Sequence, residues 1–160
     1  MATPTYDLLE SVTVASAASS VTFSSIDGSY GDLILITDSQ NATGSQNLRL
    51  TMNSETSGYS SVYALGNGSA ASSGTGGTSY IEVAVYSQNT GQNLLCQIQF
   101  CDYSATDKHK SILIRANNAS RATEMTAARL AITAAITSIT LQPASGNIAS
   151  GTFNLYGVAK

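Results

Sequence analysis

The chain has 160 residues, enough for one ordinary domain, and 11% of them are charged, against roughly 25% in a typical soluble protein. Seven Lys and Arg residues and ten Asp and Glu residues give a formal net charge of −3, so there is no basic footprint for nucleic acid or an anionic membrane surface. Apolar runs are too short for a membrane-spanning helix, and residues 1–6 lack the charged start and apolar centre of a secretion signal. We therefore expect neither nucleic acid nor a membrane as a partner.

Apolar and polar residues alternate along the first part of the chain, as in half-buried β-strands. In chain order, this alternation predicts strands at residues 10–14, 20–26, 33–36, 46–53 and 61–65. Asp27 and Gly28 predict a turn after the second of these strands. Residues 33–36 are apolar at every position, which predicts a central strand covered on both faces.

The alternation stops at residues 66–79, which are all Gly, Ser, Ala or Thr except for a single Asn. Nothing in this segment is large enough to be buried, so we expect a flexible, exposed loop or an arm that becomes ordered against a neighbour. Residues 1–6 predict a second, short arm at the N-terminus.

The alternation resumes and predicts strands at residues 80–86, 94–100, 112–114, 139–141 and 151–158. In the strand at 94–100, Leu94, Cys96, Ile98 and Phe100 share one face. Residues 121–132 fit either a helix or a strand, and we favour a strand because the residues that follow alternate.

Nine or ten short strands with turn residues between them predict an all-β chain. The expected architecture is a single antiparallel β-sandwich over residues 1–160, and the strand count favours a jelly roll over other Greek-key arrangements.

The reactive side chains do not form a recognisable catalytic set. His109 is the sole histidine, and its polar neighbours predict a solvated loop residue rather than a general base or a metal ligand. Because serine is so abundant, the presence of Ser, His and Asp in this chain is not evidence for a catalytic triad. The glutamates Glu10, Glu55, Glu82 and Glu124 are scattered singly rather than paired. We expect no enzymatic activity, no catalytic or metal-binding residues and no cofactor.

Cys96 and Cys101 are separated by an odd number of positions, so they should point to opposite faces of one strand and remain unlinked. Their spacing matches no zinc or redox motif.

Two pairs of aspartates, Asp102 with Asp107 and Asp27 with Asp32, were weighed as calcium ligands. Neither pair has the dense spacing of a calcium loop, which favours turn and surface roles.

Three Asn-X-Ser/Thr sequons begin at Asn41, Asn67 and Asn118. In a chain this rich in Ser, Thr and Asn, we interpret them as by-products of composition.

Motifs along most of the chain resemble a family of small virion proteins of tailed bacteriophages. The N-terminal half carries the resemblance at residues 6–14, 18–26, 30–33, 48–53 and 59–60, and the C-terminal end carries it at residues 136–141, 143, 145–147 and 151–157. The region from about residue 80 to residue 129 matches only in its strand pattern. The resemblance transfers no catalytic residue.

This resemblance implies a non-enzymatic virion structural protein, made in the host cytoplasm. The favoured role is a capsid decoration or cement protein that binds and stabilises the assembled head. The expected partners are the major capsid protein or neighbouring virion proteins, and the expected oligomer is a homotrimer.

The alternative is a tail-fibre or host-receptor-binding module, in which Tyr59, Tyr63, Tyr80 and Tyr86 would stack on a glycan. The resemblance favours the capsid surface over the tail.

Overall fold

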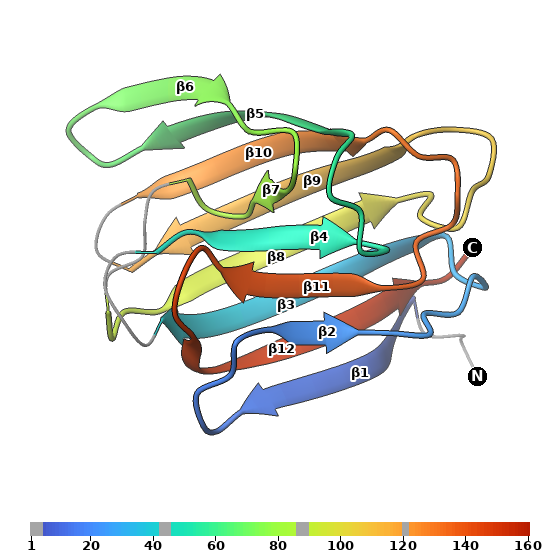
Figure 1. Cartoon of the computed structure of the whole chain (residues 1–160), viewed down its shortest axis with the longest axis horizontal. Helices are drawn as coiled ribbons and strands as arrows, with labels where there is room; N and C mark the ends of the chain where they lie inside the picture. Colours follow the sequence, from blue (N-terminus) through green and yellow to red (C-terminus); the bar gives the residue numbers. More distant parts are fainter. Residues whose placement is uncertain (1–4, 42–45, 86–89, 120–121) are drawn as a thin grey trace.

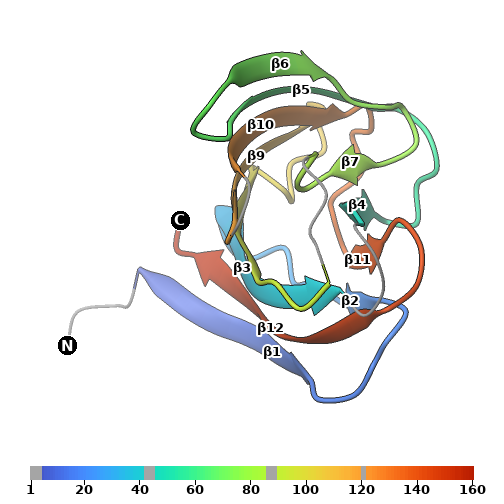
Figure 2. The same ribbon diagram turned by 90° about the vertical axis from the view of Figure 1, so that its left-hand side faces the viewer.

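A computed structural model describes residues 5–41, 46–85, 90–119 and 122–160, which form an all-β structure of two antiparallel sheets facing each other (Figures 1 and 2). The larger sheet has eight strands in the order β1 (Tyr6–Val14), β12 (Ile148–Val158), β3 (Asp32–Asn41), β8 (Leu94–Cys101), β9 (Lys110–Asn118), β10 (Thr123–Leu130), β5 (Tyr59–Gly66) and β6 (Ala71–Thr75). The smaller sheet has four strands in the order β2 (Val21–Phe23), β11 (Ile139–Pro143), β4 (Leu48–Met52) and β7 (Ile81–Glu82).

The prediction of an all-β, antiparallel sandwich is confirmed. The finer expectation of a jelly roll is not confirmed by this strand order, in which one sheet has twice as many strands as the other. No helix in the described part of the chain has the length and hydropathy needed to cross a bilayer.

The core lies between the inner faces of the two sheets. Strand β8 shows how the sequence builds it, because Leu94, Cys96, Ile98 and Phe100 are all buried, as predicted. The small sheet closes the core with buried side chains on alternate positions of each strand. The large hydrophobic residues that it contributes are Val21, Phe23, Leu48, Leu50, Met52, Ile81, Ile139 and Leu141.

Figure 2 shows that the large sheet curves around the small one, so that its outward face is convex. This curvature follows from the unequal number of strands, since eight strands must wrap around four to bury their inner face. Strands β5 and β6 form a hairpin at one margin of the large sheet, and β1 lies at the other.

Three local predictions need correction. Residues 66–79 are not a continuous loop, because Ala71–Thr75 forms the edge strand β6 and pairs with β5. Residues 80–86 were predicted as one strand, but only Ile81–Glu82 is assigned, and residue 86 lies outside the described residues. The strand at 33–36 is not covered on both faces, because the side chain of Ile36 is exposed.

Other local predictions hold. Residues 123–130 are a strand rather than a helix, as favoured. The predicted turn after β2 is present, where the Asp27 carboxylate accepts a hydrogen bond from the Ser29 N–H at 2.6 Å. Of the N-terminal arm predicted at residues 1–6, residues 1–4 lie outside the described residues. The described end of this segment does not form an arm, because Tyr6 belongs to β1 and Thr5 accepts a hydrogen bond from the Ala159 N–H at 3.0 Å.

The two sides of the large sheet can be compared directly at adjacent leucines of β8. Leu94 is 0% exposed, whereas Leu95 is 53% exposed on the outward face. We predict that Leu94→Ala lowers the free energy of unfolding by about 2–5 kcal/mol, because it leaves a cavity in the core. Leu95→Ala is its matched control and should cost less than about 1 kcal/mol. Urea unfolding of the two variants measures both values, and equal losses would contradict the assignment of the two faces.

Candidate interaction surface

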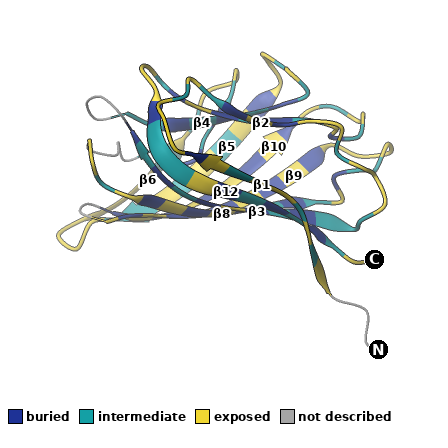
Figure 3. Ribbon diagram, turned by 90° about the horizontal axis from the view of Figure 1, so that it is seen from below, coloured by how far each residue is buried: buried dark blue, intermediate teal, exposed yellow. Residues whose placement is uncertain are grey.

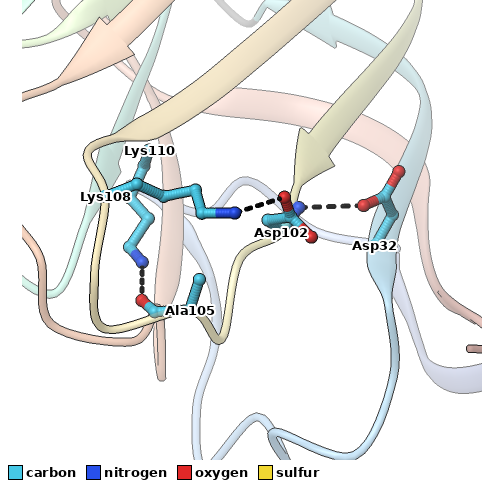
Figure 4. Close-up of polar contacts among 5 residues, drawn as sticks. All are labelled: Asp32, Asp102, Ala105, Lys108 and Lys110. Atoms are coloured by element: carbon cyan, nitrogen blue, oxygen red, sulfur yellow. Dashed lines mark hydrogen bonds and ion pairs between the residues drawn. The ribbon is translucent and has the colours of Figure 1, made fainter.

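Two of the aspartates considered as calcium ligands, Asp32 and Asp102, have structural partners at one end of the sandwich. The Asp32 carboxylate accepts hydrogen bonds from the Asp102 N–H at 2.8 Å and from Gln99 Nε2 at 2.9 Å. Asp102 forms an ion pair with Lys108, with 3.1 Å between Oδ2 and Nζ, and both side chains are more than half exposed (Figure 4). These contacts hold the connection between β8 and β9. No group of three or more His, Cys, Asp or Glu residues within the described ranges is placed to hold a metal ion.

His109 lies on the surface just before β9. Its Nδ1 is 3.5 Å from Nη1 of Arg129, a residue of β10. His109 is exposed, as predicted. A general base is usually oriented by a hydrogen-bond acceptor such as a carboxylate, and the guanidinium group beside this imidazole is a donor only.

Lys110 is a buried cation that the sequence analysis did not identify. It is 1% exposed, and its ammonium donates a hydrogen bond to the carbonyl oxygen of Ala105 (Figure 4). Burial lowers the pKa of Lys110, because desolvation disfavours the charged form. The alternation of β9 places this residue on the inner face. Its hydrogen bond to Ala105 ties the connection between β8 and β9 to the end of the core.

The two cysteines lie on opposite faces of β8, as predicted, and both are free thiols. Cys96 is buried on the inner face, where desolvation raises its pKa to about 12. Cys101 is half-buried on the outward face, and burial raises its pKa as well. A thiol with a raised pKa is a poor nucleophile, which agrees with a packing role for Cys96.

Three of the four tyrosines proposed for glycan stacking lie in the described ranges, and these three do not form a common platform. Tyr59 is 2% exposed, and its hydroxyl accepts a hydrogen bond from the Met52 N–H at 2.9 Å. The Tyr80 ring lies 4.1 Å below the guanidinium of Arg49. A Cβ atom at Gly74 would lie 2.5 Å from the Tyr63 hydroxyl, so that ring lies against the β6 backbone. Tyr86 lies outside the described residues.

Two of the three sequon asparagines are buried. Asn41 donates a hydrogen bond from Nδ2 to the Gln46 carbonyl at 2.9 Å, and Asn118 is 4% exposed. Asn67 is exposed and orders its own turn by accepting hydrogen bonds from the Ser69 and Ala70 N–H groups. Of the three sequon asparagines, only Asn67 is therefore exposed.

The main surface feature is the outward face of the large sheet. All the large hydrophobic side chains that are exposed among the described residues lie on it, namely Tyr6, Leu8, Ile36, Val62, Leu95, Leu113 and Met125. Figure 3 shows exposed segments alternating with buried ones along these strands. Large exposed apolar patches are uncommon on monomeric proteins, so this face is the candidate interaction surface.

The strand register explains how residues from distant parts of the sequence meet on this face. One cross-strand row runs over all eight strands and consists of Leu8, Tyr156, Ile34, Gln99, Leu113, Ala127, Val62 and Thr75. A hollow of about 290 Å³ lies beside this row and is lined by Tyr6, Ile34, Ile36, Gln97 and Tyr156. The outward face therefore offers both exposed apolar side chains and a shallow depression.

Charges on the outward face are few and balanced in sign. Asp32 and Asp38 are on β3, whereas Arg115 and Arg129 are on β9 and β10. Asp38 accepts a hydrogen bond from Asn93 Nδ2 at 2.6 Å. A surface of this kind, apolar with polar groups between, resembles the composition of protein–protein interfaces more than that of a catalytic cleft.

Sequence reasoning missed the outward face because it assigned the apolar run at residues 33–36 to a fully covered strand. Two apolar residues could have indicated this face, because Leu95 in β8 and Met125 in β10 occupy positions where the alternation calls for a polar residue.

Comparison with known proteins adds no assignment, since no protein-family model and no curated protein matches the chain.

The buried ammonium of Lys110 generates a pH-dependent prediction. Its folded-state pKa lies below the ordinary 10.5, so the unfolded chain holds this proton at pH values where the folded protein has released it. The free energy of unfolding therefore gains a contribution as the pH rises from the folded pKa toward 10.5. We predict that Lys110→Met loses this contribution, so that its stability relative to the wild type falls as the pH rises toward 10.5.

Lys108→Met is the matched control, because the ion pair with Asp102 raises the pKa of Lys108. Urea unfolding of both variants at several pH values measures the difference. A Lys110→Met variant whose stability relative to the wild type is constant with pH would show that folding does not lower the pKa of Lys110.

Proposed function

We propose that this chain is a non-enzymatic structural protein of a tailed-phage virion and that it decorates the assembled head as a cement protein. The observation that carries the proposal is the outward face of the large sheet, where the exposed large hydrophobic side chains gather. The resemblance of the N-terminal and C-terminal motifs to small phage virion proteins supports the same role. The proposed partner is the major capsid protein or a neighbouring virion protein.

The energetics of decoration suit a surface of this kind. Each copy buries a modest apolar area, and a shell presents many equivalent sites, so stabilisation accumulates over the particle. The balanced charges of the outward face allow it to approach a neutral or mixed partner surface without strong repulsion.

The receptor-binding alternative has weaker support from the geometry. Tyr59 is in the core, and Tyr63 and Tyr80 are engaged with Gly74 and Arg49 rather than displayed together. The proposal assigns no active site.

Localisation tests the proposal directly. Gold-labelled antibody against the purified chain should decorate the heads of intact phage particles whose genome encodes it, in electron micrographs of unfixed particles. Label confined to the tail would move the proposal to the receptor-binding alternative, and particles without label would remove the virion role.

A charge placed in the centre of the outward face should weaken binding to the shell. We predict that Leu113→Glu reduces binding to particles lacking the native protein by about tenfold or more, because it buries an unpaired carboxylate at the contact. Thr22→Glu is the control, since Thr22 is exposed on β2 of the other sheet. Co-sedimentation with particles measures binding, and equal binding of both variants would exclude the outward face as the contact.

A further inference from the structure

The edge strand β6 has an open side. It is the last strand of the large sheet, and no strand in the described ranges pairs with it opposite β5. The hydrogen bonds from the Gly76 N–H to Ser61 and from the Asn67 N–H to Ala70 fix which backbone groups face β5. Because these directions alternate along an antiparallel strand, Ala71, Ser73 and Thr75 direct their N–H and C=O groups away from the sheet.

The open side of β6 lacks the features that normally protect an edge strand. Its residues carry no charge and include no proline, and its pairing with β5 has no register shift. The opposite edge of the sheet is protected, since β1 carries Asp7 and Glu10 and has an irregularity between Leu8 and Glu10. The two edges of one sheet therefore differ in their capacity to accept another strand.

A second feature lies at the end of the same strand. A hollow of about 440 Å³ opens beside Thr75 and Gly76, and its lining includes Val62, Thr78 and Arg129. Val62 is 57% exposed. If the β6 strand of a second copy were added antiparallel to this β6, the turn at residues 67–70 of that second copy would lie alongside this hollow.

We propose that β6 pairs with β6 of a second copy of this chain, antiparallel and centred on Ser73. The pairing is self-complementary, because Ala71 of each copy lies opposite Thr75 of the other and small side chains meet throughout. Each copy also supplies a compact turn, held by the Asn67 side chain, to the hollow beside Thr75 of its partner.

Charge favours a second copy at this edge. Each chain carries a net charge of −3, so two copies repel each other over most of their surfaces, but residues 66–79 contain no charged residue at all. The uncharged hairpin is therefore a place where two identical acidic chains can approach closely.

The pairing is two-fold and closed, because each copy uses the same edge, the open side of β6. It differs from the trimer expected from the sequence. The two large sheets become one continuous sheet whose outward faces lie side by side, so both remain available to a shell. The inference goes beyond the proposed function and holds for the purified chain whether or not it is found on a virion.

Cross-linking at the centre of the pair tests the geometry. Residues opposite each other in a hydrogen-bonded antiparallel pair have Cα atoms about 5.5 Å apart, a distance that a disulfide can span. Ser73→Cys, in a Cys101→Ser background, should form a disulfide-linked dimer under mild oxidation about tenfold faster than Thr13→Cys, an exposed position on β1. Equal rates for the two variants would overturn the proposal.

Sedimentation equilibrium tests the same contact without a cysteine. The wild-type chain should approach twice its 16.5 kDa mass with rising concentration. Ser73→Lys should remain at the monomer mass, because the charge protects the edge, whereas Thr13→Lys should dimerise like the wild type. Wild-type chain that stays monomeric, forms a trimer, or dimerises equally well with Ser73→Lys would each overturn the β6 pairing. None of these results depends on where gold label falls on a particle.

Discussion

Burial of the inner face of an eight-stranded sheet by a four-stranded one is the constraint on which this structure depends. The apolar side chains of β3, β8, β9 and β12 need a covering layer, and the small sheet provides it only because the large sheet curves around it (Figure 2). The convex outward face is then left without a second layer, and the β5–β6 hairpin is left at the margin. Both proposed contact surfaces are consequences of this unequal pairing.

Much of the fold could be predicted from the sequence because period-two alternation directly reports a half-buried strand. It identified the inward set Leu94, Cys96, Ile98 and Phe100, and it favoured a strand at residues 121–132. It could not identify β6, because a strand of Ala, Ser, Gly and Thr has no apolar side chains to alternate. Such a strand is held by its backbone pairing with β5, which leaves no trace in side-chain hydropathy.

The candidate surface was harder to predict for a different reason. Leu8, Leu113 and Val62 belong to one cross-strand row, yet they are separated by long stretches of sequence. Periodicity shows which side of a strand is apolar, but it does not show which strands are neighbours or what lies over them. Ile36 shows the consequence, since an apolar run suggested a covered strand and the register placed its side chain on an open face. Lys110 is the opposite case, because a charged side chain that hydropathy would assign to the surface is buried on the inner face.

The pairing of β1 with β12 has a consequence for how the protein is made. Tyr6 lies opposite Val158, so the first strand finds its neighbour only after almost all the intervening chain has left the ribosome. Strand β3 also waits for β12 on one of its sides. Contacts between such distant segments close slowly, because the loop entropy is lost before the pairing is gained. Completion of the large sheet therefore waits for the synthesis of β12, and until then the unpaired strands β1 and β3 are exposed to wrong association.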